Sequence, residues 1–527
     1  MAHGADRLPP VTQRGSAGPL STRLVIRIRD FRFEGNTVLS TIYLRAKLSK
    51  YRNRNLTIED VEQARIEIGQ LYVKAGYINS GAILPDQNLD HGILFFKIIE
   101  GRLSEIHVKQ VGQHFLRAKY LRDRIVIGSG PPLNIVDLQQ KLEILRQDPN
   151  VARVNAELHP GPTAGTSILD VDVAETNPFQ AGLEFNNHRS PVVGAERFYF
   201  LANDSDLSGN GDRLSLRYAI LEGGFDDMRL AGANDYSIDY VLPISPYNTT
   251  IGANFTQSDD LVVEAPFRAA DISSTSRSFT LTLRQPLYRT ATDEIAVSVA
   301  GALRSNATRV LGRPFSFTYG AVNGQSNVTV IRIGQEYTRR NANDTLAIRS
   351  TFSIGLDALD STATADGIGD SVFFAWLGQV QYVRRIGQTT SLLILRAAGQ
   401  FTSDALPPLE QFSVGGFDTV RGYREDRLVR DNGVIGTAEV QIPLLEKSGR
   451  NILTLAPFFD CGYAYDNFSP SASKADFISS VGLGVLFNPN SHFSMQVYYG
   501  YPLKHYENAH DDIQDYGLHF DVLLLAL

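Results

Sequence analysis

The chain has 527 residues, a length that predicts two or more domains rather than one compact domain. Its formal net charge of −7 argues against a nucleic-acid binder that relies on a basic surface. Hydrophobic residues make up 43% of the chain, yet no apolar run reaches the roughly twenty residues of a helical membrane span. These numbers are compatible with a membrane β-barrel, because barrel strands alternate apolar and polar residues over roughly ten positions.

The N-terminal residues 1–22 are predicted to form a flexible linker. They carry prolines at positions 9, 10 and 19, but no apolar core of the kind that a secretory signal needs. We therefore expect this numbering to begin on a processed chain. Residues 24–34, which place Ile26 and Ile28 on one face, are the first to alternate as a strand.

A first α+β unit is predicted over residues 23–101. Thr57 has the features of a helix cap, because acidic residues follow it in the next turn. Apolar residues at three- and four-residue spacing over 61–71 predict a buried helical face, and Gly76 provides the C-terminal stop. Two strands follow, so the predicted order is strand, helix, helix, strand, strand.

The same order is predicted again over residues 102–177. Asn134 can cap the second helix of this unit, and Leu138, Leu142 and Leu145 form its buried stripe. For either unit by itself, a generic small α+β fold is the alternative interpretation. The tandem placement of the two units before a region of strands favours a more specific assignment.

The last part of the chain, residues 178–527, loses helical periodicity and contains about sixteen strand-like segments, roughly 22 residues per strand with its turn. Short connections such as 489–490 alternate with long ones such as 257–276, 304–325 and 402–432. This asymmetry is typical of an outer-membrane barrel, whose turns are short on one side and long on the other. A β-propeller is the alternative, but the sequence shows no blade repeat.

Two short motifs provide the candidate functional residues. Val420-Arg421-Gly422-Tyr423 lies in the long 402–432 connection, and Phe458-Phe459-Asp460-Cys461-Gly462 lies inside a strand. A carboxylate in a strand whose outer face meets lipid must point to the interior, where it needs a cation. Arg421 is the candidate partner of Asp460, and this pair would hold the loop inside the barrel. The alternative is a surface arginine in a turn and an unrelated aspartate.

The chain resembles the outer-membrane transporters of two-partner secretion, the TpsB family. The two α+β units resemble tandem POTRA domains, with FEGNT at 33–37 similar to the opening of the first, and the two motifs resemble the family's VRGY and FxDxG motifs. The resemblance covers nearly all of residues 24–527. It implies a mainly β protein in which two α+β POTRA domains precede a 16-stranded antiparallel transmembrane β-barrel.

The family resemblance also implies a function. In this family the POTRA domains lie in the periplasm and bind the N-terminal secretion domain of an unfolded exoprotein, such as an adhesin, haemolysin or toxin. The barrel then exports that protein through the bacterial outer membrane without nucleotide hydrolysis. We expect a monomer whose partners are the exoprotein and outer-membrane lipid.

The resemblance assigns roles to individual residues of the two motifs. Arg421 is the loop arginine expected inside the lumen, and Asp460 is its expected partner on the barrel wall. The residues expected to support this pair, by shaping the loop tip or the facing strand, are Val420, Gly422, Tyr423, Phe458 and Gly462.

The sequence contains no convincing active site. It has no phosphate-binding, nucleophile-elbow or zinc-protease motif. The cluster His505, His510, Asp511 and Asp512 favours a solvated surface loop over a metal site, and Cys461 is interpreted as a wall residue rather than a nucleophile. We therefore expect no enzymatic activity, cofactor, metal or nucleic-acid partner.

Three other classes of protein would account for part of this sequence. An outer-membrane assembly insertase of the same superfamily would share both motifs, but such proteins usually carry three or more POTRA domains. A diffusion porin would explain only the barrel, and an enzyme on a barrel would lack a site.

Two features depart from the family pattern. The chain ends on Leu527 rather than an aromatic residue, and residues 1–22 resemble at most the linker that follows the family's N-terminal plug helix.

Overall fold

The structure is a computed structural model that describes most of the chain. Within the described residues, no helix is long and apolar enough to cross a membrane. The predicted linker 1–22 and the terminal Leu527 lie outside them. The described ranges are 25–89, 91–223, 228–231, 235–264, 267–364, 367–387, 389–468, 475–507 and 512–526.

The chain forms two compact units, each made of several separate stretches of sequence. They do not coincide with the predicted domains, whose limits after residues 101 and 177 remain predictions. The first unit contains the described residues up to Lys109 with Ile125–Leu142 and Asn155–Asp172; the second contains Gln110–Arg124, Glu143–Val154 and the chain from Val173 onward.

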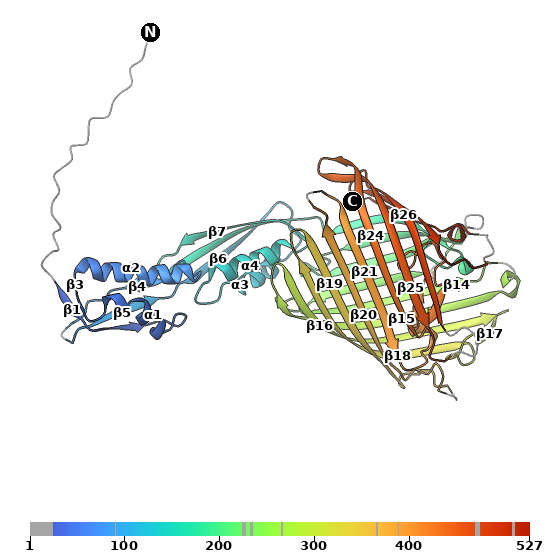
Figure 1. Cartoon of the computed structure of the whole chain (residues 1–527), viewed down its shortest axis with the longest axis horizontal. Coiled ribbons are helices and arrows are strands. Elements are labelled where there is room, and N and C mark those ends of the chain that lie inside the picture. Colours follow the sequence, from blue (N-terminus) through green and yellow to red (C-terminus); the bar gives the residue numbers. More distant parts are fainter. Residues whose placement is uncertain are drawn as a thin grey trace, which may run out of the picture. The chain divides into compact units, whose positions relative to one another are not determined.

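The first α+β region is built on a sheet of order β2-β5-β4 (Figure 1). Its elements are β1 (Ile26–Ile28), β2 (Asp30–Glu34), α1 (Thr41–Lys47), β3 (Arg54–Leu56), α2 (Ile58–Lys74), β4 (Gly81–Ile83) and β5 (Ile93–Ile99). The predicted cap at Thr57 is confirmed, because Thr57 and Asp60 exchange hydrogen bonds between side chain and backbone at the start of α2. Phe31, Phe33 and Phe96 pack together in the core beneath the helices.

The second α+β region has a sheet of order β6-β8-β7. Its elements are β6 (Arg102–Val111), α3 (Ala118–Val126), α4 (Ile135–Arg146), β7 (Val151–Pro160) and β8 (Thr166–Glu175). Asn134 accepts a hydrogen bond from the Val136 N–H at 2.9 Å, as expected of the cap of α4. Leu138 and Leu145 are buried, and Leu142 is half-buried, so the predicted stripe of α4 faces the core.

All but two of the remaining described strands form one closed antiparallel barrel (Figure 1). Eighteen segments take part, but β12 (Arg229–Leu230) and β17 (Arg313–Pro314) have only two residues each, which leaves sixteen full strands. The full strands are β9 (Phe179–Asn186), β10 (Glu196–Asp204), β11 (Arg213–Gly223), β13 (Tyr236–Pro243), β14 (Thr250–Leu261), β15 (Ile272–Arg289), β16 (Asp293–Val310), β18 (Gln325–Arg340), β19 (Asp344–Leu356), β20 (Phe374–Arg385), β21 (Leu392–Thr402), β24 (Asn432–Lys447), β25 (Arg450–Tyr465), β26 (Ala475–Phe487), β27 (Phe493–Pro502) and β28 (Leu518–Leu525). The barrel closes where β28 pairs with β9, from Asp521 opposite Asn186 to Leu525 opposite Gly182.

The outer face of the barrel is apolar because side chains alternate along each strand. In β15, Phe279, Leu281 and Leu283 are 43%, 51% and 49% exposed, whereas the intervening Thr280 and Thr282 are less exposed and face the interior. This alternation is why the hydropathy of each strand averages out and why no long apolar run appears in the sequence.

Some predicted strand ends are wrong. The connection predicted over 257–276 is partly strand, because residues 257–261 of β14 pair with residues 273–277 of β15. These residues are mostly polar, so the apolar alternation that marks a lipid-facing strand stops before the ladder does. At the C-terminus, Tyr516 lies in a short 3₁₀ turn, and the last strand begins at Leu518.

Phe96→Ala is expected to lower the free energy of unfolding of the first α+β region by about 3–5 kcal/mol, because a wholly buried ring is lost. Urea denaturation of the full chain, followed by backbone hydrogen exchange in residues 26–99, measures this change. The matched control Ile42→Ala removes a side chain that is 81% exposed and is expected to change this free energy by less than about 0.5 kcal/mol. Equal effects of the two substitutions would contradict the assigned core.

Candidate functional site

The candidate loop connects β21 to β24 and packs against the barrel wall. It contains a short hairpin of β22 (Phe412–Val414) and β23 (Leu428–Arg430), and the loop tip lies between these two strands. Val420, Arg421 and Tyr423 in the tip are 0%, 4% and 5% exposed. The alternative interpretation of Arg421 as a surface arginine is therefore wrong.

The Arg421 guanidinium lies between two carboxylates of the barrel wall. Its Nε donates to Asp460 Oδ2 at 2.8 Å and its Nη2 donates to Asp460 Oδ1 at 3.0 Å. The Arg421 backbone N–H donates to the same Oδ2 at 3.1 Å. On the other side, Nη1 donates to Glu439 Oε2 at 2.5 Å. Asp460 is wholly buried and Glu439 is 4% exposed, so water does not stabilise their charges. The two carboxylates and the Arg421 guanidinium therefore stabilise one another.

Two aromatic rings complete the surroundings of Arg421. Its Cζ lies 3.6 Å from the centre of the Phe458 ring and 4.6 Å from the centre of the Tyr498 ring, which are cation–π distances. Gly482 and Gly484 of β26 leave room for these rings, because a Cβ there would lie 2.3 Å from Phe458 Cζ and 2.2 Å from Tyr498 Cε1. This glycine pair is therefore a packing feature that accommodates the two rings.

Gly422 allows the loop tip to touch the backbone of β27. Its φ of 93° lies in the region that favours glycine, and a Cβ there would lie 2.6 Å from the Gly500 carbonyl oxygen. Gly500 is equally constrained, because its own Cβ would lie 2.6 Å from the Gly422 nitrogen. The Gly422 N–H also donates to His519 Nε2 on β28 at 3.3 Å. The tip thus contacts β27 and β28, the last two strands of the barrel.

Val420, Tyr423 and Gly462 join the tip to β25 and β26 through apolar packing. A Cβ at Gly462 would lie 2.4 Å from Val414 Cγ1 and 3.1 Å from Val420 Cγ2, so the glycine makes space for both valines. Tyr423 donates its hydroxyl to the Ser479 carbonyl at 2.9 Å. All three residues of the VRGY motif that flank Arg421 therefore contact the wall around it.

A second arginine of the tip, Arg424, binds two other connections of the barrel. Its Nη2 donates to Asp515 Oδ2 at 2.6 Å, and its Nε donates to the other oxygen of the same carboxylate. Its Nη1 donates to Glu264 Oε1 at 2.7 Å. Asp515 lies in the turn before β28 and Glu264 lies after β14. The Arg424 side chain is 10% exposed and the Asp515 side chain is fully buried.

The structure brings all the residues of the predicted site into one cluster. These are Arg421, Asp460, Val420, Gly422, Tyr423, Phe458 and Gly462. Sequence reasoning missed Glu439, Tyr498, His519 and Arg424. Glu439 carries the same signal as Asp460, an acidic residue inside a barrel strand, and the same argument would have found it.

The site has the chemistry of a fastening, because charge-assisted hydrogen bonds in an interior that excludes water are strong. Among the described residues, no group of three or more histidine, cysteine or acidic side chains is arranged to hold a metal ion. Of the histidine and aspartate cluster near the last strand, His510 and Asp511 lie outside the described residues.

Comparison with known proteins gives two family matches. The family described as haemolysin secretion/activation protein ShlB/FhaC/HecB matches residues 165–487, and the ShlB-type POTRA domain matches residues 26–101. The outer membrane transporter CdiB of Dickeya dadantii (strain 3937) is 23% identical, over 91% of this chain and 83% of its own length. The heme/hemopexin transporter protein HuxB of Haemophilus influenzae (strain 86-028NP) is 21% identical, over 86% of this chain and 80% of its own.

Solved structures with the same fold include CdiB from Escherichia coli. It superposes with a TM-score of 0.72 at 19% identity and covers 98% of this chain and 93% of its own. BamA from Haemophilus ducreyi, lacking POTRA domains 1–3, gives a TM-score of 0.53 at 13% identity, over 95% of this chain and 100% of its own. At these identities the likeness concerns the fold.

Arg421→Lys is expected to loosen the loop although it keeps the positive charge, because an ammonium cannot form paired bonds to Asp460 and also reach Glu439. Arg421→Ala is expected to loosen it further, because removing one partner of a buried ion pair costs about 3–5 kcal/mol. Hydrogen exchange of residues 415–427 in the purified chain should be fastest in the alanine variant. The exposed Arg450→Ala at the turn between β24 and β25 is the control. Loop exchange that stays at the wild-type rate in Arg421→Ala would contradict the fastening.

Proposed function

The chain belongs to the haemolysin secretion/activation family of ShlB, FhaC and HecB, and from this premise we propose that it exports an unfolded exoprotein through its barrel without nucleotide hydrolysis. It is an outer-membrane transporter, and its POTRA domains are periplasmic. The observation that supports export most directly is the loop fastened against the wall of a closed barrel by Arg421. A simple diffusion porin has no need of such a loop together with POTRA domains.

Capture of the exoprotein is expected to use the edges of the POTRA sheets. In the sheet β6-β8-β7, the outer strands β6 and β7 have ten residues each, and among the described strands each pairs only with β8. An extended segment can add to such an edge through main-chain hydrogen bonds, with modest demands on its sequence. We assign residues 23–101 and 102–177 to the two POTRA domains and 178–527 to the barrel.

Release of the Arg421 fastening is the proposed step that admits the exoprotein. Moving the tip separates Arg421 from Asp460 and Glu439, and water entering the lumen with the exported chain can solvate all three charges. Because the sequence has no phosphate-binding motif, the direction of transport must come from elsewhere. Folding of the exoprotein outside the cell can supply it, because a folded domain does not slide back. We propose that the transporter works as a monomer without enzymatic activity.

An outer-membrane assembly insertase is the second candidate, because BamA shares the barrel fold. Such proteins usually carry three or more POTRA domains. This chain has two three-stranded α+β sheets before the barrel in its described residues. The match of residues 165–487 to the haemolysin secretion/activation family favours export of one exoprotein over general barrel assembly.

Secretion of the large exoprotein encoded beside this gene tests the proposal in cells with the wild-type chain, no chain, Arg421→Ala or Arg450→Ala. We expect the exoprotein at the surface or in the medium to require the chain, to fall at least about tenfold in Arg421→Ala, a loss above 1.4 kcal/mol, and to be unchanged in Arg450→Ala. Heat-modifiability on gels should show that both variants insert as barrels. Unchanged export with loss of other barrel proteins from the outer membrane would identify the insertase instead.

A further inference from the structure

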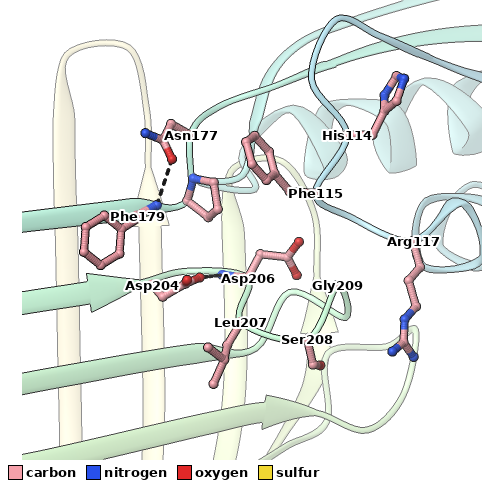
Figure 2. A pocket seen from close by; sticks show the side chains of 11 residues that line it. His114, Phe115, Arg117, Asn177, Phe179, Asp204, Asp206, Leu207, Ser208 and Gly209 are labelled. Atoms are coloured by element: carbon pink, nitrogen blue, oxygen red, sulfur yellow. Dashed lines mark hydrogen bonds between the residues drawn. The ribbon is translucent and has the colours of Figure 1, made fainter.

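A pocket of about 480 Å³ lies within the second compact unit, at the start of the barrel (Figure 2). Its walls come from the segment that precedes α3, from the start of β9 and from the turn that joins β10 to β11. Phe115, Pro178 and Phe179 provide apolar surface, and Asp204 and Asp206 provide carboxylates. Neither carboxylate belongs to the Arg421 site.

Asp206 is the feature that marks this pocket as a binding site. The residue is 6% exposed, and its Oδ1 accepts a hydrogen bond from the Gly211 N–H at 2.7 Å. Its Oδ2 is buried and has no hydrogen-bond partner among the described residues. Figure 2 shows this carboxylate pointing into the space between the turn and the segment before α3. A buried carboxylate oxygen without a donor is costly, so the arrangement lacks one component.

A positively charged donor is the partner that would stabilise this carboxylate most. Burial, and after it the charges of Asp212, Glu175 and Asp148, raises the pKa of the Asp206 carboxyl to about 6, so it is ionised in a negative field at neutral pH. Arg117 is on the pocket wall, but its guanidinium is directed to Asn210 Oδ1 at 3.4 Å. Figure 2 shows the side chains of Arg117 and His114 pointing away from the Asp206 carboxylate.

The shape of the pocket favours a long organic cation over a bare ion. The described residues contain no group of three ligands suited to a metal, and about 480 Å³ is far more than a single ion fills. The rings of Phe115 and Phe179 suit the methylene stem of a basic side chain and, by cation–π attraction, its charged end.

We propose that this pocket binds a lysine or arginine side chain of the exported protein as that protein enters the barrel. The ammonium or guanidinium pairs with the Asp206 carboxylate, and the aliphatic stem lies against Phe115 and Phe179. The inference rests on the proposed export function and adds to it a site that selects for positive charge in the passing chain.

A photo-cross-linking amino acid at Leu207 tests the proposal in the full chain during export. Leu207 is on the pocket wall and 54% exposed. Cross-linked exoprotein peptides are expected to carry lysine or arginine beside the attachment point. Asp206→Asn is expected to reduce their yield about tenfold, as for the loss of one charge-assisted hydrogen bond. The asparagine variant keeps the size of the side chain and the oxygen that accepts from Gly211, so the barrel is expected to fold.

The same cross-linker at Tyr247 is the matched control, because this residue is 64% exposed in the turn between β13 and β14. Its yield is expected to be the same with and without Asp206→Asn. A Leu207 yield that does not respond to Asp206→Asn would overturn the proposal, and so would peptides without enrichment in basic residues.

Thermal melting of the purified chain separates the two sources of a cation. A rise in Tm with magnesium chloride or spermidine that disappears in Asp206→Asn would assign the pocket to a free cation and overturn its assignment to a side chain. Export that does not require the chain at all would contradict both the proposed function and this inference. Export that requires the chain and Arg421, combined with a Leu207 cross-linking yield that is unchanged by Asp206→Asn, would contradict only this inference.

Discussion

A guanidinium held between two carboxylates in the interior of the barrel is the interaction on which the rest of this structure depends. Moving three charges out of water is expensive, and an apolar cluster of the same volume would stabilise the barrel equally well or better. The ion pairs therefore contribute position more than stability. Arg421 satisfies Asp460 and Glu439 together only when the loop tip lies at one place and in one orientation.

The elements around Arg421 are arranged so that this one position is well defined. Aromatic rings on β25 and β27 hold the plane of the guanidinium, and glycines on β26 leave space for those rings. Arg424 then attaches the same tip to the turns near β14 and β28. Strands far apart in the sequence thus meet at a single loop, so a movement of the tip must alter several parts of the wall at once.

The sequence predicts those features whose cause is local. The cap of α2 could be predicted because its capping box needs only Thr57 and a residue three positions later. Asp460 could be predicted because a charged side chain in a membrane-spanning strand must point to the interior of the barrel. His519 was missed, since it meets Gly422 across 97 residues of chain and only the strand register brings them together. The ends of β14 and β15 were misplaced for a related reason, because polar residues outside the lipid zone pair without an apolar signature.

The glycines of the site differ in how freely evolution can replace them. At Gly484, an added methyl group meets only the ring of Tyr498, which can rotate or be exchanged for a smaller side chain by a second substitution. At Gly422 and Gly500 it meets main-chain atoms of the opposing segment, which every amino acid possesses, so no change of a neighbouring side chain compensates. Drift of the sequence can therefore redesign the aromatic surroundings of Arg421 by paired steps, while the crossing of the loop tip over β27 must be inherited unchanged.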